Sequence, residues 1–188
     1  MSHLTVHRVS EDMEYTGEQL RSHWAYTTYD IIGDSAIAFV GPCDVRPEYM
    51  KDWEDLKTES AICSERMLHF IVEHFDVNLE RAVLRQHLLI ALMAEQLNRR
   101  LGDARVIRRG SDLYDGDAKV TVSVASRSAV SALIHAGINV SSRNTPVPTR
   151  GLDDYDIDVV SFADDVLAAY ARECAILRQA RCKVRACT

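Results

Sequence analysis

The sequence predicts an α+β fold, in which a mixed or antiparallel sheet carries helices packed on one face. Several short segments rich in β-branched residues follow one another along the chain, as the successive strands of a sheet do. Two longer segments, Leu79–Leu101 and the residues that follow Ser161, repeat apolar side chains every three or four positions. That period is typical of helices with one buried face.

The first half of the chain is expected to contain two strands and one short helix. Residues 35–40 read SAIAFV, a buried strand that should end at Pro42 because proline lacks the amide that a sheet ladder needs. Residues 44–60 place apolar side chains three apart around Trp53, which indicates one short amphipathic helix or lid. A second strand is expected over residues 67–75.

The main core helix is expected over Leu79–Leu101, because its apolar side chains keep a helical period throughout and Gly102 supplies a C-terminal stop. Strands are expected over residues 105–109, in a hairpin that follows directly, and over residues 130–140, where β-branched residues alternate with others.

The last helix is expected to open at Ser161, which forms a Ser-x-x-Asp capping box with Asp164. Residues 181–188 at its end are expected to fray. The chain has no internal repeat and no linker rich in proline, glycine or serine, so we expect one domain over residues 1–188.

Composition excludes several classes of partner. A formal net charge of -6 argues against nucleic acid, because phosphate recognition usually needs a basic face. The five cysteines show no CxxC spacing, which predicts neither a disulfide framework nor a zinc site and fits a reducing cytoplasm. The longest apolar run is far too short to cross a bilayer, so no membrane is expected. The sequence leaves a homodimer open.

The segment SDLYDGDAKVTVSV contains the strongest local signal, an Asp115-Gly116 pair typical of a two-residue hairpin loop. That register sets Asp112 directly opposite Lys119, so that a carboxylate and an ammonium share one face. A surface salt bridge worth at most about 1 kcal/mol is the structural alternative.

Alternation beyond the hairpin loop predicts one dry and one polar face of the second strand. A ligand is expected on the polar face. The dry face is assigned to Val120, Val122 and Val124, and the polar face to Lys119, Thr121 and Ser123.

The stretch HLLIALMAEQLNRRLGDARVIRRGSDLYDGDAKVTVSV resembles biotin protein ligases in the order and spacing of a helix, a short strand, a Trp-Pro-Asn-Asp-Leu-Tyr type motif and a turn before the essential lysine. Lys119 stands at that lysine's place. Residues 135–140, HAGINV, look like the Gly-Ile-Asn-Val strand of the same enzymes and of lipoate ligases. This resemblance covers roughly residues 66–143. The whole chain also resembles a prokaryotic family known as a domain of unknown function, which supplies no activity.

The resemblance implies a class II aminoacyl-tRNA-synthetase-like sheet on which a small carboxylic acid reacts with ATP and Mg²⁺ to form an acyl adenylate, with an acceptor that the sequence does not identify. Lys119 would stabilise the charge of both reacting anions, and Asp112 would orient it or help hold Mg²⁺. Further substrate- or nucleotide-binding residues are expected at Ser111, Arg108, Arg109, His135, Gly137, Asn139, Arg21 and His23.

The sequence departs from the ligase pattern in the segment before the strand at 67–75. Biotin ligases carry there a loop rich in glycine and arginine, whereas residues 41–65 contain seven acidic side chains against three basic ones. Such a segment would repel phosphate unless it first bound a metal or a cationic group. Two alternatives therefore stay open: a small-molecule or partner-binding protein that does not adenylate, and a transferase whose acidic lid captures a cationic substrate.

Smaller departures lie in the motif itself, where Ser111 replaces an asparagine and Thr121 and Ser123 replace small residues after the lysine. The octanoyltransferase branch of the family uses a cysteine soon after the Asn-Val strand. Here that stretch reads SSRNTPVPTRG and contains no cysteine, which argues against covalent acyl transfer by that route.

Overall fold

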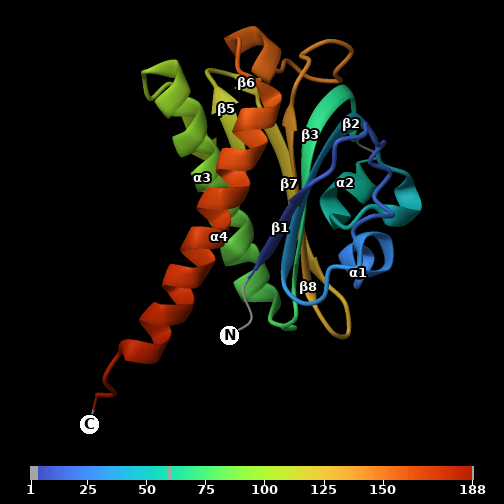
Figure 1. Cartoon of the computed structure of the whole chain (residues 1–188). Coiled ribbons are helices and arrows are strands. Elements are labelled where there is room, and N and C mark those ends of the chain that lie inside the picture. Colours follow the sequence, from blue (N-terminus) through green and yellow to red (C-terminus); the bar gives the residue numbers. More distant parts are fainter. Residues whose placement is uncertain (1–3, 59–60, 188) are drawn as a thin grey trace.

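The computed structural model describes residues 4–58 and 61–187, and its centre is a five-stranded mixed sheet (Figure 1). The strand order is β1-β2-β3-β8-β7, in which β1 pairs with β2 in parallel and the other neighbours are antiparallel. These strands are β1 (Thr5–Arg8), β2 (Ser35–Asp44), β3 (Cys63–His74), β7 (Thr121–Arg127) and β8 (Ala132–Asn139). A separate three-stranded sheet contains β4 (Val106–Arg109), β5 (Asp112–Asp115) and β6 (Ala118–Lys119).

Both long helices, α3 (Leu79–Leu101) and α4 (Val159–Lys183), pack on the same face of the large sheet (Figure 1). The short helices α1 (Trp24–Tyr29) and α2 (Trp53–Lys57) lie on its other side. Two 3₁₀ turns, η1 (Pro47–Tyr49) and η2 (Leu152–Tyr155), complete the helical elements. The predicted α+β class, with the long helices on one face, is confirmed.

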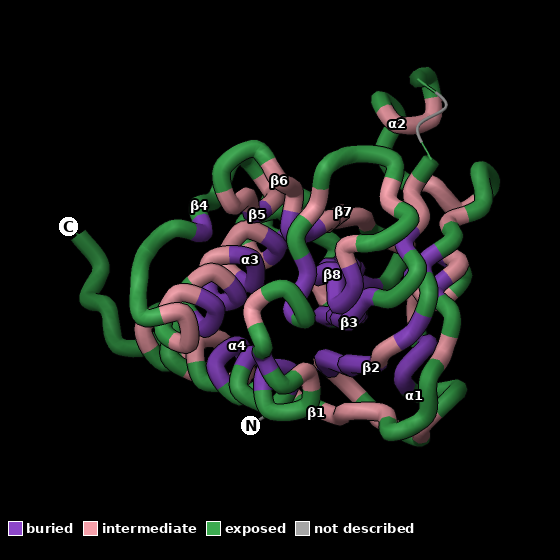
Figure 2. The backbone as a smooth tube through the Cα atoms, turned by 90° about the horizontal axis from the view of Figure 1, so that it is seen from above, coloured by how far each residue is buried: buried purple, intermediate pink, exposed green. Residues whose placement is uncertain are grey.

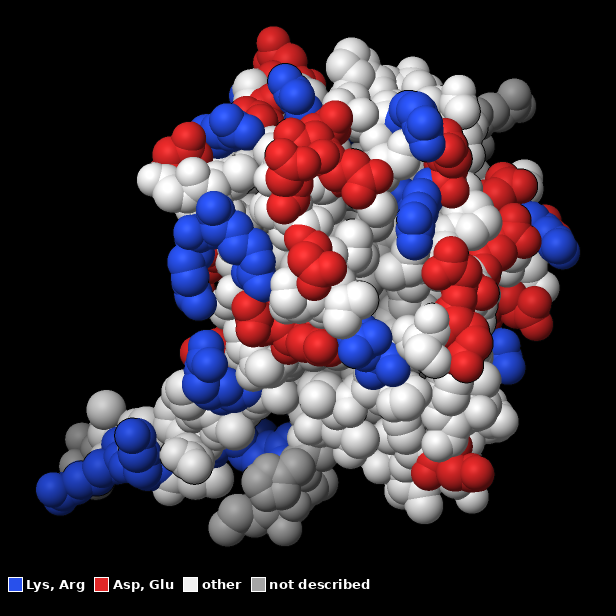
Figure 3. All heavy atoms as spheres, turned by 45° about the horizontal axis from the view of Figure 1, so that its top comes forward, with Lys and Arg blue, Asp and Glu red and all other residues white. Residues whose placement is uncertain are grey.

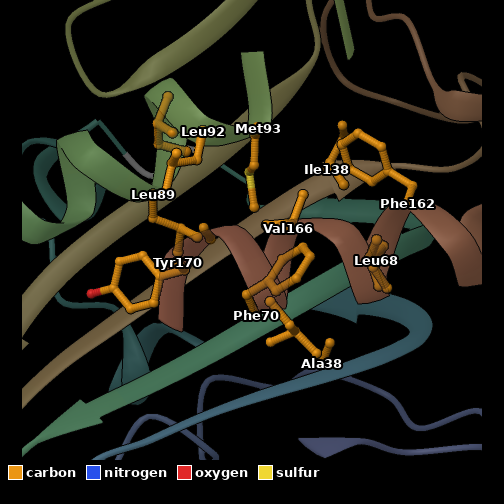
Figure 4. Packing of buried hydrophobic residues seen from close by; sticks show 14 of the residues in the cluster. Ala38, Leu68, Phe70, Leu89, Leu92, Met93, Ile138, Phe162, Val166 and Tyr170 are labelled. Atoms are coloured by element: carbon orange, nitrogen blue, oxygen red, sulfur yellow. The ribbon is translucent and has the colours of Figure 1, made fainter. Parts of the chain in front are cut away.

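The main core fills the layer between the large sheet and the long helices. Figure 4 shows the side chains that meet there, including Phe70 of β3, Met93 of α3 and Phe162 of α4, all fully buried. A smaller apolar cluster lies on the opposite face, around Trp24 and Phe39. Burying each such side chain contributes roughly 1.5–3 kcal/mol, so the long helices are held mainly by this layer.

The predicted core helix has the bounds that the sequence indicates. The side chain of Asn78 caps its first turn by accepting the Arg81 amide, and Gly102 ends it in a left-handed conformation with φ 72°. The second long helix differs from the prediction. It begins at Val159, because Asp158 accepts the amide of Ser161 and takes the capping position that was expected for Ser161.

The end of α4 also corrects the sequence reading, since the helix continues through Lys183 and only residues 184–187 lack regular structure. Thr188 lies outside the described residues. Among the described residues, no helix combines the length and the apolar character needed to cross a membrane.

Strand β2 continues past Pro42 to Asp44, so the expected end at that residue is wrong. The register against β3 shifts between Gly41 and Cys43, so the missing amide of Pro42 interrupts no bond of that ladder, and the Pro42 carbonyl accepts from the Tyr15 amide. Extending β2 carries Cys43 to the side of Tyr15, with which it forms an isolated parallel bridge.

The expected helix or lid over residues 44–60 is two short pieces, η1 and α2, with an extended link between them. Its apolar stripe is not buried, because 75% of the surface of Trp53 is exposed. Figure 2 shows α2 standing out from the body of the molecule in the exposed and intermediate colours. Glu59, one of the seven acidic residues of the segment, lies outside the described residues.

Candidate functional site

The β5–β6 hairpin brings Lys119 and Asp112 together, although in a different register from the expected one. Asp115 pairs with Ala118, so the loop residues are Gly116 and Asp117, and Lys119 lies opposite Tyr114. Gly116 has φ 60° at the first loop position, as a type II′ turn requires.

The expected direct pairing of Asp112 with Lys119 is therefore wrong, but their expected shared face is confirmed. The true register differs from the expected one by two residues, and residues two apart on a strand point to the same side. Asp112 is thus the diagonal neighbour of Lys119, and Lys119 Nζ lies 2.9 Å from Asp112 Oδ2.

The environment of this ion pair raises the pKa of both groups, for different reasons. Burial raises the pKa of Asp112, and the nearby Lys119 ammonium and the Thr121 hydroxyl offset that rise only in part. Burial also works against the charged form of Lys119, but the attraction of Asp112 outweighs it and the pKa of Lys119 is raised. Lys119 therefore stays an ammonium at neutral pH.

The expected grouping of Val120 with Val122 on one dry face is wrong, because the chain changes sheets at Val120: Val120 packs in the main core, whereas Val122 packs against the smaller cluster on the opposite face. The amide of Val120 donates to Leu113 of the small sheet, and its carbonyl accepts from the Asn139 amide of the large one. Alternation restarts there. Val122 lies opposite Gly137 on β8, on the side away from the long helices, while Ser123 receives a hydrogen bond from Gln86 of α3.

A cavity of about 530 Å³ lies on the face of the sheet away from α3 and α4. That volume is in the range of small-molecule sites. Apolar walls come from Leu20, Met67 and Val122, and the residues after β8 close one side with Pro146 and Pro148. Segment 49–55 and residues 61–64 cover the cavity from the side of α2.

The charges around the cavity are mostly negative. Among the described residues that line it, four are aspartates, Asp52, Asp55, Asp112 and Asp117, and two are lysines, Lys51 and Lys119. Burial, together with the neighbouring Asp52, raises the pKa of Asp55. Figure 3 shows acidic side chains gathered on the side of the molecule that carries α2, at its right.

Five of the expected site residues line this cavity: Lys119, Asp112, Ser111, His135 and Asn139. Gly137 lies among the lining side chains, since a Cβ atom there would be 2.8 Å from Met67 Cε and 3.5 Å from His135 Cε1. Strand alternation explains this, because His135, Gly137 and Asn139 are spaced by two along β8.

The two arginines before the hairpin do not line the cavity. The Arg108 guanidinium lies 3.0 Å from His87 Nδ1. Arg109 lies over the ring of Tyr114, 5.0 Å from its centroid, and 3.7 Å from Asp117. Arg109 is thus near the rim, while Arg108 faces α3, in agreement with their alternation along β4.

Arg21 and His23 also lie apart from the cavity lining. Arg21 is 3.8 Å from Glu18 on the exposed surface. His23 precedes α1 in a left-handed conformation with φ 61°, and its amide donates to the buried Glu73 carboxylate at 2.9 Å. The structure gives this segment a role in anchoring α1 to β3, because Glu73 holds the start of the helix.

Sequence reasoning missed Tyr15, which lines the cavity, and His69, which is buried in contact with the lining residue His135. The ring of Tyr15 stacks on His135 with centroids 3.8 Å apart, and His69 Nδ1 lies 3.1 Å from His135 Nε2. His74 is on the opposite face, 2.9 Å from the hydroxyl of Tyr170 on α4, as its spacing from His69 predicts. No local pattern marks Tyr15, which reaches the site through its bridge to Cys43.

Burial holds His69 and His135 in the neutral form. It lowers the pKa of His69 to about 4, even though contacts with the backbone at Gly41 and Pro42 act in the other direction. The pKa of His135 is also lowered well below its usual range by burial and by the neighbouring His69. In the part of the chain that the structure describes, no three His, Cys, Asp or Glu side chains form a group that could hold a metal ion.

Comparison with solved structures identifies the fold. The chain is similar to a biotin protein ligase from Aquifex aeolicus, with a TM-score of 0.61, 16% identity, and coverage of 95% of this chain and 72% of that one. It is also similar to Ta0514 of T. acidophilum, a putative lipoate protein ligase, with a TM-score of 0.55, 14% identity, and coverage of 91% and 86%. At these identities the likeness shows a biotin/lipoate ligase fold.

Nearer relatives share the sequence as well. A protein of unknown function from Pyrococcus horikoshi is 35% identical, with a TM-score of 0.93 over 98% of this chain and 100% of that one. An uncharacterised protein of Methanocaldococcus jannaschii is 37% identical over 178 residues, which are 91% of this chain and 80% of that protein. The family model for the domain of unknown function DUF366 matches residues 4–185, and the chain belongs to that family.

Proposed function

We propose that this protein binds a small carboxylic acid in the cavity and activates it with ATP as an acyl adenylate, for transfer to an acceptor. The observation that supports this most directly is the ammonium of Lys119, fixed 2.9 Å from Asp112 in the wall of a cavity of about 530 Å³. Proteins of the same fold are known with the corresponding ligands: the Aquifex ligase in complex with biotin and ATP, and Ta0514 with bound lipoic acid.

Lys119 supplies what the activation step requires. A carboxylate that attacks a phosphate brings two anions together, and a fixed cation between them lowers that barrier. The raised pKa of Lys119 keeps the cation charged, and Asp112 limits its orientations. An incoming carboxylate would share the ammonium with Asp112, while Asn139, whose amide lies 3.5 Å from the Lys119 carbonyl, would border the same region.

The lining residues fit ATP in part. The ammonium of Lys119 suits a phosphate, whereas Asp52 and Asp55 would repel one. Carboxylate oxygens are the ligands that Mg²⁺ prefers, so these two residues would hold a magnesium ion that arrives with the nucleotide. The ion would supply charge neutralisation, and Asp52 and Asp55 would orient it.

The direct test is pyrophosphate release from ATP over a panel of carboxylic acids. We expect the native protein and the Lys183→Ala variant, which removes an exposed lysine of α4, to respond to the same acid. The Lys119→Ala variant should be slower by at least about 100-fold. Equal rates for Lys119→Ala and the native protein would refute the role of Lys119, provided that both unfold at similar urea concentrations.

The acidic lining supports a second candidate, a protein that binds a small molecule on the same fold without adenylation. Four aspartates against two lysines suit a cationic or neutral ligand better than a triphosphate. Calorimetry with ATP separates the candidates. Binding of ATP in the presence of Mg²⁺ supports the ligase, whereas a lack of nucleotide binding with and without divalent metals supports the second candidate.

A further inference from the structure

A chain of hydrogen bonds runs from the backbone of β2 to the floor of the cavity. His69 Nε2 lies 3.3 Å from the carbonyl oxygen of Gly41, and His69 Nδ1 lies 3.1 Å from His135 Nε2. Both rings are buried, with 0% and 3% of their surface exposed. The chain therefore fixes which nitrogen of each neutral ring carries the proton.

The carbonyl of Gly41 sets the direction of the chain, because a carbonyl oxygen can only accept. His69 Nε2 must then carry the hydrogen, which leaves His69 Nδ1 as an acceptor in a neutral ring. His135 Nε2 must in turn donate to it. The remaining nitrogen, His135 Nδ1, consequently has no hydrogen and presents a lone pair.

This lone pair is open to the cavity. His135 lines the cavity, and its hydrogen bonds to described residues involve Nε2 alone. Among the described residues, Ser35 Oγ is the one fully buried polar side-chain atom without a hydrogen-bond partner. His135 Nδ1 also has no such partner, so it must retain accessible surface, and that surface faces the cavity. Tyr15 stacks flat on the same ring and limits its rotation. The cavity floor thus holds a fixed, neutral acceptor.

His135 and Lys119 line the cavity at different levels along β8. His135 and Asn139 are four positions apart on β8, and the side chain of Asn139 reaches the Lys119 carbonyl. At the rise of a β-strand, four positions correspond to about 13 Å between the Cα atoms of His135 and Asn139. A ligand that spans the cavity would therefore meet a cation at one end and a hydrogen-bond acceptor at the other.

We propose that His135 Nδ1 is a specificity-determining acceptor, which selects a carboxylic acid that carries an N–H or O–H donor at the end remote from its carboxylate. This inference rests on the proposed function only in placing the carboxylate at Lys119. An acid with a purely alkyl end would leave the lone pair of His135 desolvated and unpaired, which costs binding free energy.

Calorimetry without ATP tests the selection independently of adenylation. The probes are ω-hydroxyalkanoic acids of graded length, their methyl ethers, which lack the donor, and the unsubstituted acids. We expect one hydroxy acid to bind about tenfold more tightly than its ether and its unsubstituted analogue. Equal binding of the hydroxy acid and the ether, or no binding by any probe, overturns the proposal.

Two variants and one spectroscopic measurement complete the test. His135→Phe keeps a ring for Tyr15 to stack on and should abolish the preference, whereas His7→Phe, on β1 and outside the cavity lining, should keep it. Nitrogen NMR of the free protein should show His135 with hydrogen on Nε2 and none on Nδ1, and the opposite tautomer overturns the proposal. If selection persists but no pyrophosphate is released, adenylation fails and this inference stands.

Discussion

Lys119 Nζ lies 2.9 Å from Asp112 Oδ2, with 29% and 15% of the two side chains exposed. Replacing Lys119 by methionine leaves the Asp112 carboxylate buried without its cation. We expect the free energy of unfolding at pH 7 to fall by about 1–3 kcal/mol, less than for a fully buried pair because both groups retain some exposure. Urea unfolding measures the change.

The double variant Lys119→Met with Asp112→Asn is the control for that loss. It removes the stranded charge, so its free energy of unfolding should be higher than that of Lys119→Met alone. If the two substitutions instead destabilise the protein additively, the ion pair has no coupling and the structural interpretation of Lys119 and Asp112 is wrong.

Gly137 gives a second prediction, which concerns ligand binding rather than stability. A methyl group at this position would lie 2.8 Å from the flexible end of Met67 and 3.4 Å from Val122 Cγ2, so Met67 can move aside into the cavity. We expect Gly137→Ala to change the free energy of unfolding by less than about 1 kcal/mol and to weaken acid binding at least about tenfold.

The Gly33→Ala variant is the matched control for Gly137→Ala. Gly33 has φ 91° and no atom within 4 Å of an added Cβ, so alanine there strains the backbone without touching the cavity. Gly33→Ala should lower stability by about 1 kcal/mol and leave acid binding unchanged. Equal acid affinity of Gly137→Ala and the native protein would contradict the position assigned to the ligand.

Gly41 is required for a different reason, close backbone contact. A Cβ atom there would collide with the carbonyl oxygen of Met13, which is part of the backbone and cannot rotate away. We expect Gly41→Ala to lower the free energy of unfolding by more than about 3 kcal/mol, against about 1 kcal/mol for Gly102→Ala, whose added methyl group meets open space. Similar losses for the two variants in urea unfolding would contradict this packing.

The sequence predicts features that depend on local periodicity. Helix α3 follows from its apolar repeat and from Gly102, and both are properties of adjacent residues. The shared face of Lys119 and Asp112 also follows, because a two-residue change of register leaves alternation intact. Exact cross-strand partners do not follow, because the Asp-Gly pair accommodates more than one turn type and the sequence does not choose between them.

The floor of the cavity could not be predicted, because it depends on pairing between distant strands. His69 and His135 are 66 residues apart and meet only because β3 and β8 are neighbours in the large sheet. The order of strands is a tertiary property that periodicity does not encode.

The helix or lid expected over residues 44–60 differs from the structure for another reason, although its local pattern is present in the sequence. Its helical period around Trp53 is real, but 75% of the surface of Trp53 is exposed and α2 has no buried residue, so the period does not mark a buried face.

The buried histidines predict how stability depends on pH. Burial is the strongest influence on each ring: it lowers the pKa of His69 to about 4 and also lowers that of His74 despite its contact with Asp34. In the unfolded chain a histidine has a pKa of about 6.5, so the unfolded state binds more protons between these values. The free energy of unfolding should therefore fall as pH decreases from about 6.5 to about 4, by on the order of 3 kcal/mol from His69 alone.

Urea unfolding over that pH range, for the native protein and for His69→Asn, measures this dependence. The asparagine cannot titrate, and its amide oxygen can still accept from His135 Nε2, so the variant should lose part of the slope while it retains the preference of the cavity for donor-bearing acids. An unchanged slope would show that His69 is not held neutral. A reduced slope with lost selectivity would show that the tautomer of His135 needs the imidazole of His69 itself, rather than any acceptor in its place.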